Sequence, residues 1–260
     1  MRTALTIAGS DSSGGAGIQA DLKTFAALRV YGTSAITAVT AQNTLGVVSS
    51  APLPADLVTA QIEAVAGDLQ IDATKIGMLA TAAIVEAVVA AIEELDLPLV
   101  VVDPVLVSKG GQRLLDDDGV QALRAELLPL ARVVTPNLPE AEALSGRRIE
   151  SIPDARDAAR RLQDMGAAAV IITGGHGTGA EIIDLLLDAD TFHEFRTKRI
   201  ETKNTHGTGC TFASAVAAHL ALGHSLPEAA ERAQQYVAGA IAHALAIGHG
   251  HGPLNHFWLY

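Results

Sequence analysis

Near the amino terminus stands the stretch Leu5-Thr6-Ile7-Ala8-Gly9-Ser10-Asp11-Ser12-Ser13-Gly14-Gly15-Ala16-Gly17. Residues 5–8 predict a short buried strand, residues 10–17 a glycine-rich turn, and residues 18–28 a helix. The same order of apolar segment, polar turn and helix recurs along the chain. Such alternation is typical of a mostly parallel sheet with helices on both faces. We therefore expect a three-layer α/β/α fold.

The remaining elements follow from the same patterns. Strands are predicted at 34–39, 73–76, 99–102, 133–135 and 168–172, and an antiparallel pair at 182–187 and 191–195. Helices are predicted at 54–69, 81–95, 116–127, 151–165, 211–222 and 227–246. No linker, repeat or shift in composition divides the sequence, so we expect residues 1–260 to form one domain.

Composition excludes several classes of partner. The formal net charge is −11, from 29 acidic and 18 basic residues, and no basic run exceeds Gly146-Arg147-Arg148. Nucleic acids and anionic membranes normally bind to a basic patch, so neither is expected as a partner. The single cysteine excludes an intrachain disulfide and fits a reducing compartment. No apolar run approaches the ~18 residues needed to span a bilayer. These features predict a cytoplasmic protein.

Polar or glycine-rich turns follow the predicted strands at 9–17, 41–44, 77–81, 103–111 and 173–179. Ligands of parallel sheets bind beyond the carboxyl ends of the strands, so these turns are expected to share one site. The run Gly15-Ala16-Gly17-Ile18-Gln19-Ala20 formally matches a dinucleotide fingerprint. That fingerprint requires an acid at the end of the second strand, where this chain has Ala41-Gln42-Asn43. We therefore reject a nicotinamide enzyme.

The only cysteine lies in Thr205-His206-Gly207-Thr208-Gly209-Cys210-Thr211, directly before a helix rich in small residues. Unpaired amides at a helix start, with glycines ahead of them, favour an anion, most often phosphate. A thiol in that field is expected to have a lowered pKa. The alternative is an inert cysteine buried under the helix.

Several polar residues keep two interpretations. Asp21 lies one turn into the first helix, where it would interact with the helix dipole or bond a substrate hydroxyl. Gln42 offers donors and an acceptor that can bind the edge of a heterocycle. Asp103 follows four apolar residues and is a turn residue or a ligand. Asn137 and Glu140 are three residues apart, which suits either magnesium waters and phosphate oxygens or a capping box.

Close histidines in Gly248-His249-Gly250-His251-Gly252 suggest zinc, but the sequence has no second cluster of ligands beside them. A polar tail that packs near the site is the preferred interpretation.

Taken together, these motifs resemble the hydroxymethylpyrimidine/phosphomethylpyrimidine kinases of thiamine biosynthesis, a branch of the ribokinase-like superfamily. The resemblance runs nearly from end to end. It rests on the runs at 7–21, 41–44, 75–79, 103–105, 108–111, 135–142, 205–211 and 250–257. Departures are mild: Leu106 stands where many relatives have methionine, and Thr40 stands where others have an aliphatic residue.

The resemblance implies a role for each matching residue. Cys210 takes the place of the catalytic base, and the amides around Gly207, Thr208 and Gly209 hold the transferring phosphate. The implied pyrimidine-binding residues are Gly9, Asp21, Gln42 and Met78. The implied residues for ATP are Asp103, Asn137, Glu140, Thr173 and Gly175, with Asp103 and Glu140 holding Mg²⁺ through water.

The implied activity is ATP-dependent phosphorylation of 4-amino-5-hydroxymethyl-2-methylpyrimidine, and then of its monophosphate to the diphosphate. ATP and Mg²⁺ are the expected cofactors, and a homodimer is the expected assembly. A pyridoxal or pyridoxine kinase on the same scaffold is the alternative enzyme. A pyrimidine-binding protein without catalysis is the alternative of another class.

Overall fold

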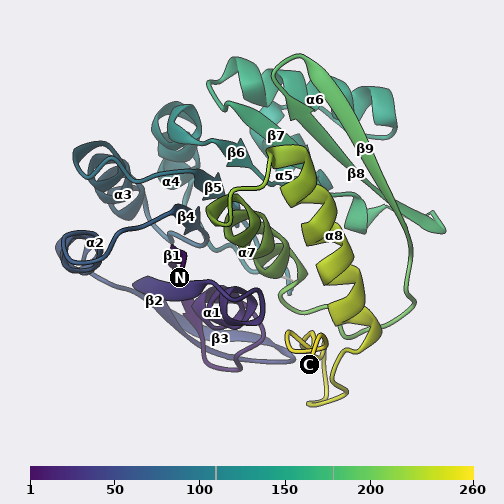
Figure 1. Cartoon of the computed structure of the whole chain (residues 1–260), viewed down its shortest axis with the longest axis horizontal. Helices are drawn as coiled ribbons and strands as arrows, with labels where there is room; N and C mark the ends of the chain where they lie inside the picture. Colours follow the sequence, from purple (N-terminus) through teal and green to yellow (C-terminus); the bar gives the residue numbers. More distant parts are fainter. Residues whose placement is uncertain (109, 178) are drawn as a thin grey trace.

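A mostly parallel sheet forms the centre of the molecule, with helices on both sides (Figure 1). The computed structural model describes residues 1–108, 110–177 and 179–260. Within these residues nine strands make one sheet, in the order β3-β2-β1-β4-β5-β6-β7-β8-β9. The strands from β2 to β7 run parallel, whereas β3, β8 and β9 join antiparallel at the two edges. The expected three-layer α/β/α fold is confirmed.

The elements have the following bounds. The strands are β1 Thr3–Asp11, β2 Tyr31–Asn43, β3 Gly46–Pro52, β4 Ala73–Ile76, β5 Val100–Val102, β6 Val133–Val134, β7 Ala169–Ile172, β8 Glu181–Asp188 and β9 Thr191–Lys198. The α-helices are α1 Gly17–Ala27, α2 Ala55–Ala66, α3 Ala82–Glu94, α4 Asp117–Ala122, α5 Leu138–Ser145, α6 Ile152–Asp164, α7 Thr208–Ala221 and α8 Leu226–Ala242. A π-helical turn covers Leu123–Leu127, and 3₁₀ turns cover Leu128–Leu130 and Gly174–His176.

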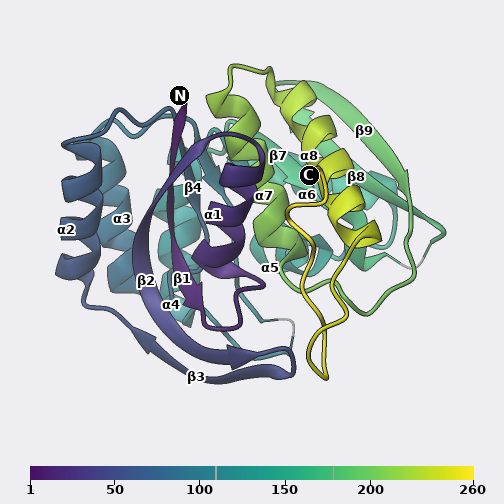
Figure 2. The same cartoon turned by 60° about the horizontal axis from the view of Figure 1, so that its bottom comes forward.

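Alternate residues of each strand enter two separate cores, because successive side chains of a strand point to opposite faces. Val100 and Val102 of β5 pack with the helices from α2 to α6, whereas Val101 packs with α1, α7 and α8. Helices α7 and α8 contribute many alanines to the second core, and these small side chains let the two helices lie close to the sheet. This packing brings the start of α7 to the carboxyl ends of the central strands (Figure 2).

Side-chain caps fix several helix starts that the sequence predicts. Thr81, Asp116 and Ser151 each accept a hydrogen bond from a backbone N–H of the first helical turn. A cap of this kind stabilises a helix by about 1 kcal/mol. The expected helix at 116–127 is wrong in detail, because α4 ends at Ala122 and continues as the π-helical turn.

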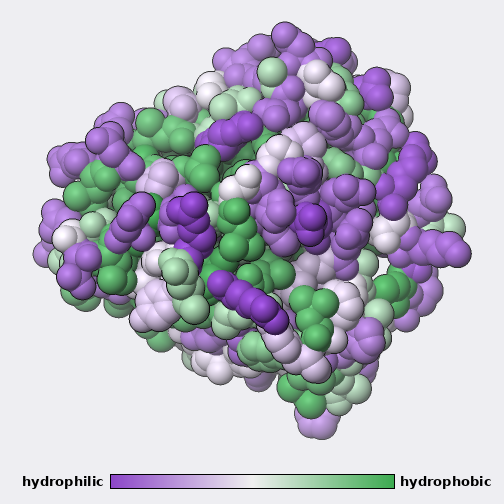
Figure 3. Space-filling view, viewed as in Figure 1, coloured by the Kyte–Doolittle hydropathy of each residue, from purple (hydrophilic) through white to green (hydrophobic). Residues whose placement is uncertain are grey.

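The sequence reading omitted β3 and α5. Strand β3 lies at the edge of the sheet and exposes Val48, so it lacks the apolar run by which buried strands are found. Helix α5 is short and begins at Leu138 with Asn137 as its N-cap, and the sequence indicates it only through the capping-box interpretation of Asn137 and Glu140. Hydrophilic and hydrophobic residues alternate in small groups over the face drawn in Figure 3. No helix of the described residues is long and apolar enough to cross a bilayer.

Candidate active site

A cavity of about 420 Å³ opens at the carboxyl ends of the parallel strands. Its volume lies within the range that small-molecule sites occupy. All five turns predicted to share a site contribute to its wall, through Gly9, Gln42, Met78, Asp103 and Thr173 among others. The loop before α7 closes another side of the cavity with residues from Thr205 to Cys210. The convergence of these turns on one site is therefore confirmed.

Most of the predicted site residues line this cavity. They are Gly9, Gln42, Met78, Asp103, Asn137, Glu140, Thr173, Gly207, Thr208, Gly209 and Cys210. Asp21 and Gly175 are not part of the wall. Gly175 is exposed, and its carbonyl oxygen accepts a hydrogen bond from Arg199 Nη1 at 3.0 Å.

Asp21 lies outside the cavity wall. Its side chain is fully buried behind the cavity, where it accepts hydrogen bonds from Thr6 Oγ1 at 2.6 Å and Ser214 Oγ at 2.7 Å. Lys75 Nζ donates a third at 3.1 Å. These three donors use three of the roughly four acceptor sites of the carboxylate, and contact of Asp21 with a substrate hydroxyl stays a prediction.

The loop before α7 approaches the β1–α1 turn very closely. Gly207 has a φ of +84°, and a Cβ there would lie 1.8 Å from the carbonyl oxygen of Gly15. Only glycine fits such a position. Helix α7 begins at Thr208, so the amides of Gly209 and Cys210 belong to the first turn, which has no intrahelical acceptors. Gly209 and Cys210 line the cavity, so their amides are candidates to hold an anion there.

The Cys210 thiol does not have the lowered pKa that the sequence suggested. Burial raises the pKa of the thiol above its ordinary value, and the carboxylates of Asp103 and Asp21 raise it further. The Lys75 ammonium and the amide of Gly17 oppose this shift without overcoming it. The helix start favours a thiolate, but dehydration and two carboxylates from distant segments outweigh it. The thiol is hydrogen-bonded to the carboxylate of Asp103.

Lys75 is a functional candidate that the sequence reading gave no role. Its side chain is fully buried, it lines the cavity, and its Nζ lies 3.1 Å from Asp21 and 3.9 Å from Asp103. Burial alone would lower the pKa of Lys75, but the carboxylate of Asp21 holds it above the ordinary value. A lysine inside the buried strand Ala73–Ile76 could have been recognised, because a buried charge requires a partner.

Asn137 and Glu140 form the capping box that was one of their two interpretations. Glu140 N–H donates to Asn137 Oδ1, and Asn137 N–H donates to Glu140 Oε2, both at 3.0 Å. Both residues also line the cavity, so the cap and a role at the site are compatible. Burial, followed by the charge of Asp103, raises the pKa of Glu140 to about 8.

Asp103 and Glu140 fit a water-coordinated Mg²⁺. Burial raises the pKa of Asp103. Both carboxyl groups lie in the cavity wall, where a bound cation would stabilise their negative charge. Mg²⁺ keeps several waters and needs few protein ligands. Among the residues that the structure describes, no three His, Cys, Asp or Glu side chains gather into a closed metal site. The histidine tail is included in that finding, so zinc receives no support there.

A second polar network, outside the sequence predictions, joins the β1–α1 turn to the loop before α7. His206 Nε2 lies 2.9 Å from Asp11 Oδ2 and 3.3 Å from Gln42 Nε2. Hydrogen bonds from His206, Ser13 and Ala16 lower the pKa of Asp11 to about 2, although burial acts in the opposite direction. A single sequence gives little sign of this contact, because Asp11 and His206 are far apart in the chain.

The carboxy-terminal segment packs beside the site, as the preferred interpretation of the histidine tail predicts. Gly250 N–H donates to Thr44 Oγ1 at 3.1 Å, and His251 N–H donates to the carbonyl oxygen of Thr44 at 2.8 Å. His206 N–H donates to the carbonyl oxygen of Gly252 at 3.1 Å. In Figure 2 this segment runs beside the tip of the β2–β3 hairpin.

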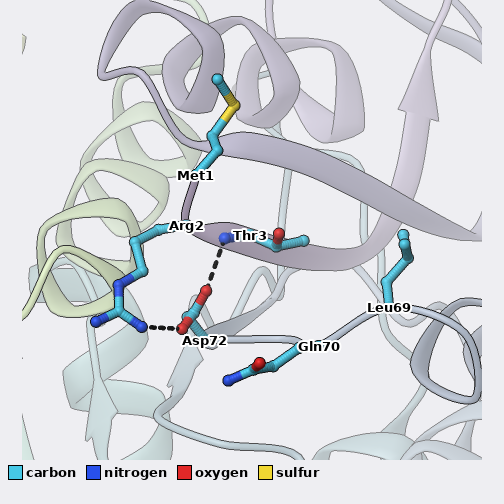
Figure 4. Close-up of a pocket in the computed structure, with 6 residues that line it drawn as sticks. All are labelled: Met1, Arg2, Thr3, Leu69, Gln70 and Asp72. Carbon is cyan, nitrogen blue, oxygen red and sulfur yellow. Dashed lines mark hydrogen bonds and ion pairs between the residues drawn. The ribbon is translucent and has the colours of Figure 1, made fainter.

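Another pocket lies at the opposite end of the sheet, near the start of β1 (Figure 4). Its wall comprises Met1, Arg2, Thr3, Leu69, Gln70 and Asp72. The Asp72 carboxylate accepts hydrogen bonds from Arg2 Nη1 at 2.5 Å and from the backbone N–H of Thr3 at 2.8 Å. These polar groups satisfy one another, so we assign the chemistry to the larger cavity.

Comparison with known proteins agrees with this geometry. The phosphomethylpyrimidine kinase family model matches residues 11–255. The hydroxymethylpyrimidine/phosphomethylpyrimidine kinase of Bacillus subtilis is 52% identical over 98% of this chain and 94% of that protein. The thiamine biosynthesis bifunctional protein ThiED of Geobacter sulfurreducens is 51% identical over 97% of this chain, which spans only 51% of that longer protein.

Solved structures with the same fold include kinases for two different rings. The ADP complex of a Bacillus subtilis pyridoxal kinase superimposes with a TM-score of 0.92 at 41% identity, covering 100% of this chain and 98% of that one. A phosphomethylpyrimidine kinase from Clostridium difficile gives a TM-score of 0.83 at 41% identity, covering 93% and 100%.

The fold is therefore that of a ribokinase-like kinase. Within that class, the chain belongs to the phosphomethylpyrimidine kinase family.

Proposed function

We propose that the protein uses ATP to phosphorylate 4-amino-5-hydroxymethyl-2-methylpyrimidine and then phosphorylates the monophosphate to the diphosphate, in thiamine biosynthesis. The observation that carries this proposal is the cavity wall, where Gln42, Met78 and the amides of Gly209 and Cys210 face one space. Two relatives, at 52% and 50% identity, are hydroxymethylpyrimidine/phosphomethylpyrimidine kinases. Nucleotide complexes among the structural relatives support ATP as the donor.

The residues divide the work of phosphoryl transfer, which depends on position and charge more than on covalent chemistry. Gln42, Gly9 and Met78 bind the pyrimidine ring. Thr173 and Asn137 contribute to the wall on the side of the nucleotide. When bound, Mg²⁺ neutralises charge on the ATP phosphates, and Asp103 and Glu140 would hold it through water.

Cys210 receives the proton of the substrate hydroxyl in the first phosphorylation. The thiol proton passes to Asp103, to which the thiol is already hydrogen-bonded, and the hydroxyl proton passes to the sulfur. The hydroxyl oxygen then bonds to the terminal phosphorus of ATP, and the bond from that phosphorus to the bridging oxygen breaks, which releases ADP. The second acceptor is an anionic phosphate, so that step needs no base.

The test is a phosphate-transfer assay with ATP and Mg²⁺ that offers hydroxymethylpyrimidine, its monophosphate and pyridoxal in parallel. We expect turnover of both pyrimidines, and a higher kcat/KM for hydroxymethylpyrimidine than for pyridoxal. A preference for pyridoxal would instead establish the alternative enzyme. Binding of a pyrimidine without ADP formation would establish a binding protein.

We also propose that the protein acts as a homodimer, by its likeness to the family. Light scattering coupled to size exclusion checks this assembly. A mass of one chain at assay concentrations would contradict it.

A further inference from the structure

Gln42 lies between two polar side chains, and their hydrogen-bond donors and acceptors do not match the two ends of its carboxamide. Thr40 Oγ1 lies 2.9 Å from the carbonyl oxygen of Ser10 and 3.1 Å from Gln42 Oε1. On the other side, Gln42 Nε2 lies 3.3 Å from His206 Nε2. A hydroxyl has one proton, so Thr40 cannot donate to both oxygens.

The Asp11 carboxylate determines which ring nitrogen of His206 carries a proton. Asp11 Oδ2 accepts from the backbone N–H groups of Gly15 at 3.0 Å and Ala16 at 2.8 Å, and it faces His206 Nε2 at 2.9 Å. With a pKa of about 2, Asp11 is an anion at neutral pH and can only accept hydrogen bonds. His206 Nε2 must therefore carry the proton, and it cannot accept one from Gln42 Nε2.

One rearrangement removes the contact between two donors. If the carboxamide of Gln42 turns by half a turn, its Nε2 donates to Thr40 Oγ1. Its Oε1 then faces the N–H of His206, whose single proton lies mainly toward Asp11 Oδ2 and is shared with Gln42 in a three-centre bond. Thr40 is then free to donate its single proton to Ser10. The two ends of a carboxamide differ little in shape, so the hydrogen-bond network decides their orientation.

We propose that His206, oriented by Asp11, and Thr40 fix the carboxamide of Gln42 in this turned orientation and thereby determine which ring the site accepts. This proposal rests on the proposed function, in which Gln42 binds the ring. A carboxamide has two donor hydrogens and two acceptor lone pairs, and the protein uses one of each. One donor and one acceptor remain for the substrate. They complement an aminopyrimidine, whose amino group donates beside a ring nitrogen that accepts.

His206 is rigid enough for this positioning role. A Cβ on Gly15 would lie 2.4 Å from His206 Cδ2, so the imidazole ring packs directly on the backbone of the β1–α1 turn. The side chain is also buried, with 9% of the residue exposed. Thr40 is equally fixed, because the residue is 4% exposed and its hydroxyl reaches the backbone of β1.

Kinetics of four variants test the proposal. In H206L the carboxamide loses the N–H that it shares with Asp11, and we expect the KM for hydroxymethylpyrimidine to rise by about threefold to tenfold, with the KM for ATP changed less than about twofold. H206Q keeps a donor side chain and is expected to recover most of the loss. T40V, which keeps the shape and removes the hydroxyl, should raise the same KM by about threefold to tenfold.

The matched control is H219L, because His219 is a buried histidine outside the cavity, with 8% exposure. We expect both KM values of H219L to equal those of the wild type. The ratio of kcat/KM for hydroxymethylpyrimidine to that for pyridoxal should fall in H206L and T40V and stay constant in H219L. Equal rises in the KM for ATP and for the pyrimidine in H206L would overturn the proposal, as would an H206Q variant no better than H206L.

A second readout does not depend on turnover. The side-chain amide signals of Gln42 in ¹⁵N-labelled protein without substrate should shift in both H206L and T40V, and remain in place in H219L. Unchanged Gln42 signals in H206L would overturn the positioning role. If the wild type does not phosphorylate hydroxymethylpyrimidine, the proposed function fails, and the amide signals still decide whether His206 and Thr40 orient Gln42.

Discussion

The ammonium nitrogen of Lys75 lies 3.1 Å from a carboxylate oxygen of Asp21, and neither side chain is exposed to solvent. The pair joins β4 to α1 beneath the cavity, and Ser214 brings α7 to the same carboxylate. Thr6 of β1 is the third donor, so β1, β4, α1 and α7 meet at one buried carboxylate.

Breaking this ion pair is expected to destabilise the fold. K75M leaves the Asp21 charge without its cation, which costs about 3–5 kcal/mol of unfolding free energy. The double variant K75M/D21N removes both charges and should recover part of that loss. Urea unfolding of the wild type, both single variants and the double variant measures the coupling. Strictly additive effects would mean that the two residues do not act as a pair.

Two glycines of the loop before α7 should separate folding from catalysis. G207A places a methyl group against the carbonyl oxygen of Gly15, so we expect a large loss of stability. In G209A the new Cβ would lie 3.9 Å from Asp103 Oδ1, an ordinary contact, and would project into the cavity. G209A should therefore unfold like the wild type while kcat falls by about 10- to 100-fold. Thermal unfolding and steady-state kinetics check the two variants, and a destabilised G209A would contradict this interpretation.

The two phosphorylation steps should respond differently to loss of Cys210. C210A removes the proton acceptor for the hydroxyl, and general-base catalysis contributes about 10²- to 10⁴-fold to such a step. We expect a loss of that order with hydroxymethylpyrimidine and a much smaller loss with the monophosphate. Single-turnover assays with each substrate measure this difference. Equal losses in both steps would count against Cys210 as the base.

A pH effect on stability is expected from His219. Burial, followed by the charges of His224 and Arg232, lowers the pKa of His219 from 6.5 to about 4. Between these values the unfolded chain binds the proton and the folded chain does not, so stability falls as the pH drops from 6.5 to 4. H219L should lose less stability than the wild type over this window. Some loss remains in the variant, because burial also lowers the pKa of His256 to about 4. Denaturant midpoints at pH 7 and pH 4.5 provide the test, and parallel pH curves for the two proteins would refute it.

The sequence predicted the architecture well because alternating apolar segments and turns are local signals. Thr81, Asp116 and Ser151 begin helices where capping residues were expected, and the antiparallel pair β8–β9 was found from its alternation. Strand β3 was not predicted, because it lies at an edge of the sheet and most of its side chains are exposed. Such a strand is held by backbone hydrogen bonds to β2, which leave no hydrophobic pattern in the sequence.

The candidate site was only partly predictable, since its electrostatics depend on contacts between distant segments. Gln42, Asp103 and Cys210 could be placed at the site from the turns that carry them. The occupied carboxylate of Asp21 could not be foreseen, because Lys75 and Ser214 come from β4 and α7. The raised pKa of the Cys210 thiol has the same origin, as it follows from burial and from two carboxylates elsewhere in the chain.

The bond from His206 N–H to the carbonyl oxygen of Gly252 has a consequence for how the protein is made. Gly252 follows α8 in the chain, so the ribosome delivers it after the loop before α7 and after all the strands of the described sheet. Because a domain folds as a unit during synthesis, the loop before α7 gains this support only when the later segment has emerged.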